Sequence, residues 1–246
     1  MSPEHLEPIA DGAWPARERE RLGGWRLNAA DGFSLRINAC WPLGEPDRDP
    51  EVAIDAVEAF YAERGLPVRF KLTEGMTAPA DLAERLARRG YATHGETLVM
   101  TGAVAGAADP DVTLSTAPDP AFEAVLVASA KGDLADARER LEALARIPAP
   151  ARFARLAVEG RAAALGACAV DGDAVGIFGM RTDPDFRRRG LARRVLGALL
   201  VEAEGLGART AYLQVEAANA PAIALYAARG FSTAYRYRYW SRPARD

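Results

Sequence analysis

The chain has 246 residues, of which 49% are hydrophobic and 26% are charged, and this is typical of a globular protein of about two domains. Its formal net charge of −3 and its two scattered histidines and two scattered cysteines argue against nucleic-acid binding, a metal site and a disulfide framework. It shows no long apolar segment and no leader pattern, so we expect a cytoplasmic protein.

The first half of the chain is expected to alternate short strands with helices. Residues 1–24 are polar and form an expected N-terminal extension, in which residues 16–22 look weakly helical. Strands are predicted over 25–28 and 33–40, around a turn at Ala30-Asp31-Gly32. After a proline-rich acidic loop, the spacing of apolar residues predicts a helix over 52–64, a strand over 68–72, a helix over 80–89 and a strand over 97–101.

Residues 102–111 are small and polar and show no hydrophobic period, so we place a domain boundary there. A strand at 112–116 is followed by a mainly helical region over 120–147, broken at residues 131–133. Turns at Glu159-Gly160 and Asp171-Gly172 predict three antiparallel strands. The expected elements of this region are strands over 152–158, 162–170, 174–181, 210–216 and 234–240, and helices over 191–204 and 220–229.

The two halves resemble each other in the order of their elements. Residues 25–95 can be laid on residues 165–235 without a gap, although few of the paired residues are identical. Turn glycines match, with Gly65 on Gly205 and Gly90 on Gly230. We therefore expect a divergent duplication, with one domain over 25–105 and another over 112–246.

The strongest chemical signal is a loop that leads from a strand into an amphipathic helix, with the pattern Arg187-x-x-Gly190-x-Ala192. Small residues let the backbone approach a ligand closely, and the helix start presents free N–H groups and the positive end of its dipole. Such a loop suits a pyrophosphate group. The three arginines at 187–189 suit the phosphates of coenzyme A, or they are an ordinary solvated charge run.

A second motif begins at Asn219, a suitable N-cap, and places Tyr226 on the helix that follows. Its pattern is N-x-x-A-x-x-L-Y-x-x-x-G-F, starting at Asn219. Together with the preceding strand, loop and helix, it resembles the acetyl-CoA-binding core of the GNAT superfamily of N-acetyltransferases. The resemblance covers residues 174–231. It implies an α/β (α+β) fold of two GNAT-like repeats, each a mixed, largely antiparallel twisted sheet flanked by helices, with the C-terminal repeat complete.

The resemblance also implies the residues that bind acetyl-CoA, as a co-substrate and without a metal. Met180, Arg181 and Thr182 would offer backbone groups to the pantetheine arm and the acetyl carbonyl. The pyrophosphate would be held by the loop of Arg187, Arg188, Arg189, Gly190, Leu191 and Ala192. Asn219 would contact the cofactor, and Tyr226 would stand near its sulfur.

The family mechanism is direct attack of an amine on the thioester, which requires a base for the amine and an acid for the thiolate. Tyr226 is the candidate acid, although a structural helix aromatic would give the same pattern. Relatives that acetylate peptide N-termini often have a Glu where this chain has Gln214, which cannot take a proton. Glu216 lies on the same strand face and is the candidate base, with a water relay as the alternative.

The N-terminal half lacks this equipment. The positions that match the phosphate loop include Asp47, Asp49 and Pro50, which repel phosphate and remove a backbone donor. The arrangement resembles tandem GNAT proteins with one degenerate repeat, and we expect acetyl-CoA only in the C-terminal half. Arg36 and Asn38, on one face of the predicted strand 33–40, would bind the acceptor or form an interdomain hydrogen-bond network.

The resemblance implies a small-molecule or peptide amine as the acceptor, with no nucleic acid and no membrane partner. A non-catalytic acyl-CoA-binding sensor or scaffold is the alternative function. Two sets of aromatic residues are interpreted as structural. The alternation of Tyr235, Tyr237 and Tyr239 with Arg236 and Arg238 predicts a two-faced edge strand rather than a nucleic-acid platform, and Trp14, Trp25 and Trp41 are expected to pack within the N-terminal half.

Overall fold

The computed structural model describes residues 1–130 and 133–242. The first half contains α1 (Pro3–Ala13), β1 (Glu18–Leu22), β2 (Trp25–Ala29), η1 (Leu35–Ile37), β3 (Cys40–Pro42), α2 (Pro50–Glu63), β4 (Arg69–Thr73), α3 (Leu82–Arg88) and β5 (Ala92–Ala103). The second half contains β6 (Val112–Ser115), α4 (Pro120–Ser129), α5 (Leu134–Ala145), β7 (Ala151–Val158), β8 (Arg161–Asp171), β9 (Ala174–Thr182), η2 (Pro184–Phe186), α6 (Leu191–Gly205), β10 (Thr210–Glu216), α7 (Ala220–Ala227) and β11 (Ser232–Ser241). None of the described helices is long and apolar enough to cross a membrane.

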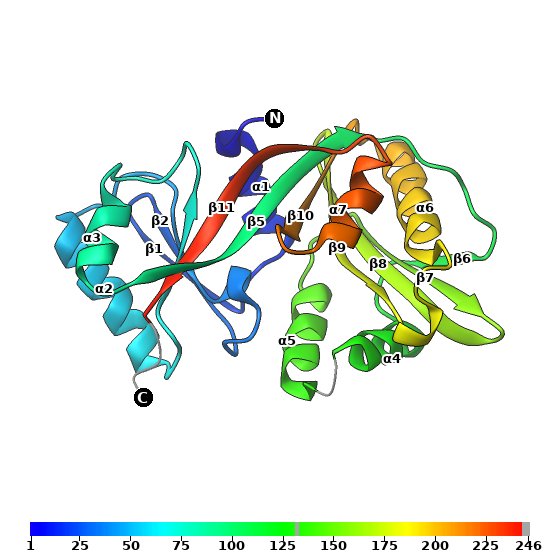
Figure 1. Ribbon diagram of the computed structural model, residues 1–246, viewed down its shortest axis with the longest axis horizontal. Helices are drawn as coiled ribbons and strands as arrows, with labels where there is room; N and C mark the ends of the chain where they lie inside the picture. Colours follow the sequence, from blue (N-terminus) through cyan, green and yellow to red (C-terminus); the bar gives the residue numbers. More distant parts are fainter. Residues whose placement is uncertain (131–132, 243–246) are drawn as a thin grey trace.

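The described strands form one mixed sheet, in which each half lends a strand to the other. The order is β1-β2-β3-β4-β11-β5-β10-β9-β8-β7-β6. The last strand, β11, pairs antiparallel with β4 and β5, both from the first half, while β5 pairs antiparallel with β10. Figure 1 shows β5 and β11 running diagonally between the lobe with α2 and α3 and the lobe with α4 to α7. The sheet is therefore continuous across the two halves.

In the second half, helices cover both faces of the sheet. Successive side chains of β8 point to opposite faces, and those on both faces are buried against a helix. Phe122 of α4 packs against Phe153 of β7, with ring centroids 5.7 Å apart, in the same cluster as Leu165 of β8. The neighbouring Ala164 of β8 belongs to the opposite cluster, with Val195 of α6. This period of two is the signature of a strand buried on both faces. The predicted fold class, a twisted mixed sheet flanked by helices, is confirmed.

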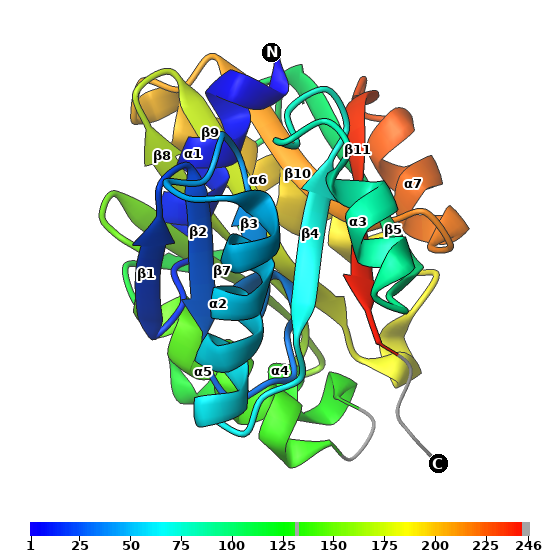
Figure 2. The same ribbon diagram turned by 90° about the vertical axis from the view of Figure 1, so that its left-hand side faces the viewer.

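The first half uses the same alternation. Cys40 of β3 belongs to the cluster formed with α2 and α3, whereas its neighbour Trp41 belongs to the cluster on the α1 side. Figure 2 shows α2 and α3 lying over the strands on the side that faces the viewer. In chain order, α2, β4, α3 and β5 match α6, β10, α7 and β11. This order supports the predicted duplication, while the domain limits at 25–105 and 112–246 stay a prediction.

The structure corrects the expected elements near the N-terminus. Residues 18–22 form strand β1 rather than a weak helix, because pairing with β2 leaves the four charged side chains of β1 exposed at the edge of the sheet. Helix α1 was not predicted, because Pro8 and Gly12 are unfavourable inside a helix, yet α1 forms and buries Leu6 and Ala10. The interruption predicted at residues 131–133 falls partly on residues 131–132, outside the described residues, and Asp133 caps α5.

The predicted strand 33–40 is also wrong. The chain forms the short helix η1 there, because the side-chain oxygen of Asn38 accepts hydrogen bonds from the backbone N–H groups of Ala30 at 2.8 Å and Gly32 at 3.0 Å. These bonds fold the segment back on itself and leave β3 for residues 40–42. Arg36 and Asn38 therefore do not share a strand face.

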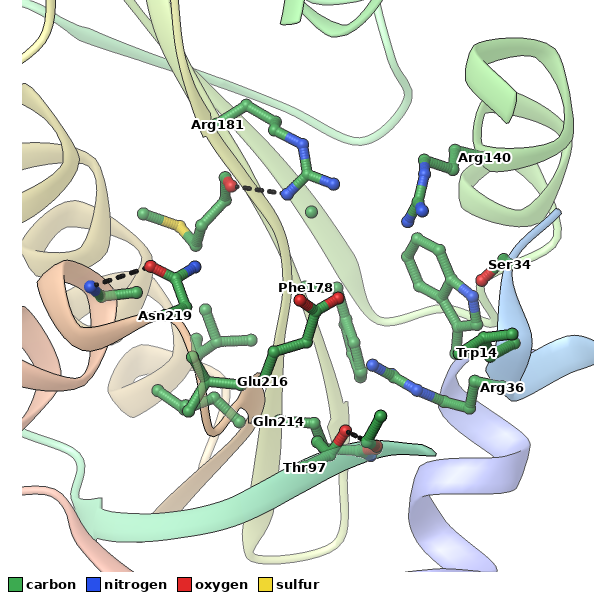
Figure 3. A pocket seen from close by; sticks show the side chains of 18 of the residues that line it. Trp14, Ser34, Arg36, Thr97, Arg140, Phe178, Arg181, Gln214, Glu216 and Asn219 are labelled. Carbon is green, nitrogen blue, oxygen red and sulfur yellow. Dashed lines mark hydrogen bonds between the residues drawn. The ribbon is translucent and has the colours of Figure 1, made fainter. Parts of the chain in front are cut away.

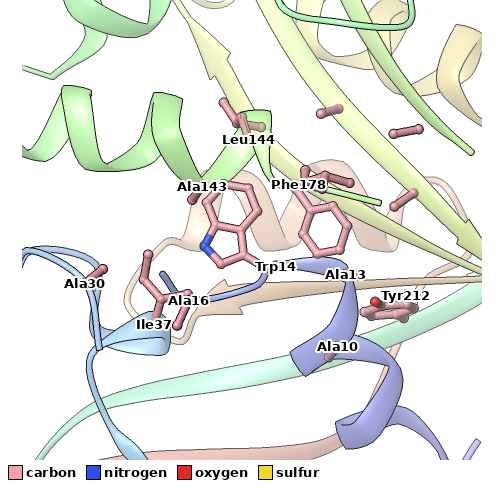
Figure 4. Packing of buried hydrophobic residues seen from close by; sticks show 14 of the residues in the cluster. Ala10, Ala13, Trp14, Ala16, Ala30, Ile37, Ala143, Leu144, Phe178 and Tyr212 are labelled. Carbon is pink, nitrogen blue, oxygen red and sulfur yellow. The ribbon is translucent and has the colours of Figure 1, made fainter. Parts of the chain in front are cut away.

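The structure changes two expectations about aromatic residues. Trp14 packs against Phe178 of β9 in the second half, with ring centroids 5.6 Å apart, rather than within the first half alone (Figure 4). β11 is two-faced as predicted, with its tyrosines buried and Arg236 and Arg238 exposed, but it lies between β4 and β5 and is not an edge strand. The turn at Glu159-Gly160 is confirmed, with φ values of 52° and 77°.

Candidate active site

A cavity of about 630 Å³ lies where β9 and β10 separate. Their parallel pairing ends at Ile177 and Leu213, although both strands continue beyond these residues. A bulge in β9 accompanies the separation, and it contains Gly179 with a φ of 60°. The backbone of β9 after Ile177 therefore has an edge towards β10 that no strand of the described sheet covers.

The loop before α6 forms one end of the site. Arg188 has a φ of 61° and Gly190 a φ of 76°, so left-handed residues alternate with the others just before the helix starts. The backbone N–H groups of residues 188–192 donate to no protein oxygen in the described part of the chain. A side chain added at Gly190 would meet no atom within 4 Å, so this surface is open. Free N–H groups at an open helix start fit a phosphate group.

Tyr226 of α7 lines the cavity and is buried. Burial disfavours the phenolate and raises the pKa of Tyr226 to about 12, an effect that the charge of Arg181 opposes. The hydroxyl therefore keeps its proton at physiological pH and can donate it. Asn219 caps the same helix, with its side-chain oxygen 3.3 Å from the backbone nitrogen of Ala222 (Figure 3).

The end of β10 supplies two polar side chains to the cavity, Gln214 and Glu216. The side-chain oxygen of Gln214 accepts a 2.8 Å hydrogen bond from the hydroxyl of Tyr237 on β11. Its nitrogen Nε2 is buried and has no partner among the described residues. Glu216 is exposed, and neither histidine of the chain lines the cavity. Glu216 is thus the carboxylate available to take a proton here.

The opposite wall comes from the first half of the chain. Trp14, Ser34, Arg36 and Thr97 of this half line the cavity, and Arg140 of α5, from the second half, lines it as well. Figure 3 shows Arg36 reaching in from this side, across from Gln214 and Glu216. The cavity is therefore formed jointly by the two halves.

Comparison with known proteins identifies the family. A family model described as "Probable histone acetyltransferase Rv0428c C-terminal" matches residues 4–240. The chain belongs to this family. The match runs through both halves, including the strands that they share. The predicted resemblance to GNAT N-acetyltransferases is confirmed.

Two curated relatives show different extents of similarity to this chain. The "[Ribosomal protein bS18]-alanine N-acetyltransferase" of Salmonella typhimurium is 44% identical over 80 residues, which cover 32% of this chain and 54% of that protein. The chain thus spans about half the length of this relative. The "Uncharacterized N-acetyltransferase YobR" of Bacillus subtilis is 26% identical over 247 residues, covering 95% of this chain and 96% of that protein.

A solved structure shares the whole fold of this chain. The GCN5-related N-acetyltransferase from Kribbella flavida has a TM-score of 0.72 at 15% identity, covering 100% of this chain and 96% of that one. At this identity, the likeness concerns the fold alone.

The structure gathers around this cavity the residues that the sequence predicted for the site. Those that line the cavity are Met180, Arg181, Arg187, Glu216, Asn219 and Tyr226. Those that lie beside it, on the end of β9 and the loop into α6, are Thr182, Arg188, Arg189, Gly190, Leu191 and Ala192. The side chain of Leu191 is buried in the core, so this residue can offer a ligand only its backbone. The roles assigned to these residues stay predictions.

Sequence reasoning missed Trp14, Ser34 and Arg140. Trp14 follows a helix that was not predicted, and Ser34 lies in the segment taken for a strand. Arg140 gave no signal of its own, because its pairing with Asp136 at 2.8 Å is an ordinary i,i+4 helix pair.

Proposed function

We propose that the chain transfers the acetyl group of acetyl-CoA to a primary amine and binds acetyl-CoA once, in the C-terminal half. The observation that carries the proposal is that one cavity joins the separated ends of β9 and β10, the start of the phosphate loop and the buried Tyr226. The family and the fold of the chain are those of N-acetyltransferases.

The chain offers acetyl-CoA two kinds of binding group. The free N–H groups of residues 188–192 would hold the pyrophosphate, with Arg187 to Arg189 adding positive charge. The uncovered edge of β9 at Met180, Arg181 and Thr182 would bind the extended arm. When bound, acetyl-CoA supplies an activated acetyl thioester.

Two side chains would move the protons of the reaction. As the N–C bond forms and the C–S bond breaks, Glu216 takes a proton from the amine, directly or through water. Tyr226 gives a proton to the departing sulfur, and its raised pKa of about 12 keeps that proton available. Gln214 cannot act as the base, and its side-chain oxygen is engaged by Tyr237.

Steady release of free coenzyme A in the presence of an amine panel tests the proposal. The panel should include small amines and peptide amines, because the Salmonella relative is named for an alanine of ribosomal protein bS18 and the family description names a probable histone acetyltransferase. Continuous turnover supports an enzyme. Tight binding of acetyl-CoA without turnover of any amine would instead support the alternative, a non-catalytic sensor or scaffold.

We also infer a cytoplasmic location. Cys40 and Cys168 are both buried and free, which suits a reducing compartment. Immunodetection in fractionated cells tests this, and recovery of the protein outside the cytoplasm would contradict it.

A further inference from the structure

Two buried hydrogen-bond donors in the lining of the cavity have no partner among the described residues. The Nε atom of Arg36 is buried without a partner, and its guanidinium makes no salt bridge within residues 1–130 and 133–242. The Nε2 atom of Gln214 is also buried without a partner among these residues. Leaving buried donors unsatisfied is unfavourable. Because both residues line the cavity, water fills these hydrogen-bonding positions in the free protein, and a bound ligand can replace it with its own acceptor atoms.

Aromatic side chains neighbour both donor groups. Gln214 is held by Tyr237, whose hydroxyl bonds to its oxygen at 2.8 Å, so the NH2 group is left to donate. The guanidinium carbon of Arg36 lies 5.9 Å from the ring centre of Trp14. Figure 3 shows the Arg36 side chain crossing the cavity towards the strand that carries Gln214. Both side chains thus line the same cavity and face it from different walls.

The charges around the cavity favour an anionic group in this position. Its lining contains four arginines and one carboxylate, which are Arg36, Arg140, Arg181, Arg187 and Glu216. Arg140 is paired with Asp136, and Arg187 begins the phosphate loop. Of these four arginines, Arg36 is the one most distant from that loop in the sequence. No carboxylate of the described residues lies within salt-bridge distance of its guanidinium. A carboxylate on the acceptor would supply this missing partner.

The segment that carries Arg36 is held in place before any acceptor binds. The carboxylate of Glu139 on α5 is fully buried. It accepts hydrogen bonds from the backbone nitrogens of Asp31, Phe33 and Ser34 at 2.8, 3.1 and 2.5 Å. These bonds fix the turn that leads into η1 and therefore fix the position of Arg36. A preorganised cation of this kind is typical of a binding group rather than of a mobile surface arginine.

We propose that the acceptor amine also carries a carboxylate, which the guanidinium of Arg36 and the side-chain NH2 group of Gln214 bind together. This rests on the proposed function, and it adds the class of acceptor: amino acids and related aminocarboxylates. The planar guanidinium matches a carboxylate in two parallel hydrogen bonds. A lysine-rich peptide without a nearby carboxylate would place further positive charge beside Arg36 and is disfavoured.

Matched pairs of acceptors test the proposal. Glycine, β-alanine and γ-aminobutyrate are compared with their carboxamides, which keep the amine and remove the charge. We expect kcat/KM for at least one acid to exceed that of its amide on the order of a hundredfold, the effect expected from a buried charged hydrogen bond. Arg36→Ala should abolish this preference through a raised acceptor KM. Arg36→Lys should restore part of it, and the affinity for acetyl-CoA should stay the same in both variants.

Arg138→Ala is the matched control, because Arg138 is exposed on α5 and its removal changes the net charge equally. Equal use of acids and amides would overturn the proposal, as would equal loss of both with Arg36→Ala. Acetylation of peptide amines but not of any of these acids would overturn it while leaving the proposed function intact. If no amine is acetylated, calorimetric titration of the coenzyme A complex with the three acids decides, since binding that requires Arg36 supports the site and undetectable binding overturns it.

Discussion

The carboxylate of Glu139 on α5 accepts a 3.0 Å hydrogen bond from the side-chain amide of Asn38, across the boundary between the two halves. Both residues are fully buried. Of the two roles considered for Asn38, the structure supports the interdomain network. Arg36, two residues earlier, lines the cavity instead.

This relationship predicts the effect of Glu139→Ala. The substitution leaves several buried N–H donors without an acceptor, and we expect the free energy of unfolding to fall by about 3 kcal/mol. The KM for the acceptor amine should rise more than the dissociation constant of acetyl-CoA, because the segment that Glu139 holds carries Arg36, which is proposed to bind the acceptor. Urea unfolding and steady-state kinetics measure both effects. Glu142 on the same helix is half-exposed, and Glu142→Gln is the control. An equal loss of stability in this variant would contradict the structural role given to Glu139.

Tyr226→Phe should lower turnover on the order of a hundredfold, the usual effect of losing a general acid. The phenyl ring keeps the packing against Phe231, whose ring centroid lies 6.1 Å away, so acetyl-CoA binding and stability should change little. Single-turnover acetylation and calorimetry separate the two effects. An unchanged rate, with the chemical step shown to be rate-limiting, would remove Tyr226 from the mechanism.

The pKa of Tyr226 predicts the shape of the pH profile. A proton donor is active below its pKa, and burial places that of Tyr226 at about 12. We therefore expect kcat/KM to rise as the acceptor amine loses its proton, with no fall from Tyr226 up to about pH 10. Tyr226→Phe should lower the whole profile without changing its shape. A decline between about pH 8 and pH 10 in the wild type that disappears in this variant would show that Tyr226 titrates much lower.

Gly190→Glu should abolish acetyl-CoA binding, because a carboxylate would occupy the open face of the phosphate loop. The φ of 76° adds strain of about 1–2 kcal/mol for any residue other than glycine. Gly90→Glu is the matched control: its φ is 81° and a side chain there also meets no atom within 4 Å. Calorimetric titration should give one site per chain in the wild type and in the control. Two sites per chain, or normal binding by Gly190→Glu, would contradict the proposed location.

Elements that a local pattern determines could be predicted from the sequence. The loop at Arg187 to Ala192 and the capped helix at Asn219 are local motifs, and both lie as expected. Elements that depend on distant residues could not be predicted. Nothing near Asn38 indicates that its segment folds back to meet α5, and no local pattern in residues 232–241 shows that β11 leaves its own half. The wall of the cavity that contains Arg36 depends on these long-range contacts. The sequence could therefore suggest Arg36 as a binding residue, but it could not show that Asn38 has a different, structural role.

The shared strands predict that a fragment of residues 112–246 does not fold into an active enzyme. In that fragment β11 loses both of its partners, β4 and β5, and β10 loses β5, so a row of backbone groups is left unpaired. The tyrosines of β11, which are buried in the whole chain, would also be exposed. We expect the fragment to be aggregated or largely unfolded by circular dichroism and to release no coenzyme A above background. Co-expression with residues 1–111 should restore both folding and turnover, which distinguishes missing strand partners from a damaged catalytic half. A monomeric 112–246 fragment with cooperative unfolding and normal acetylation would show that the exchanged strands are dispensable. It would also show that the first half, including Arg36, is not needed to bind the acceptor.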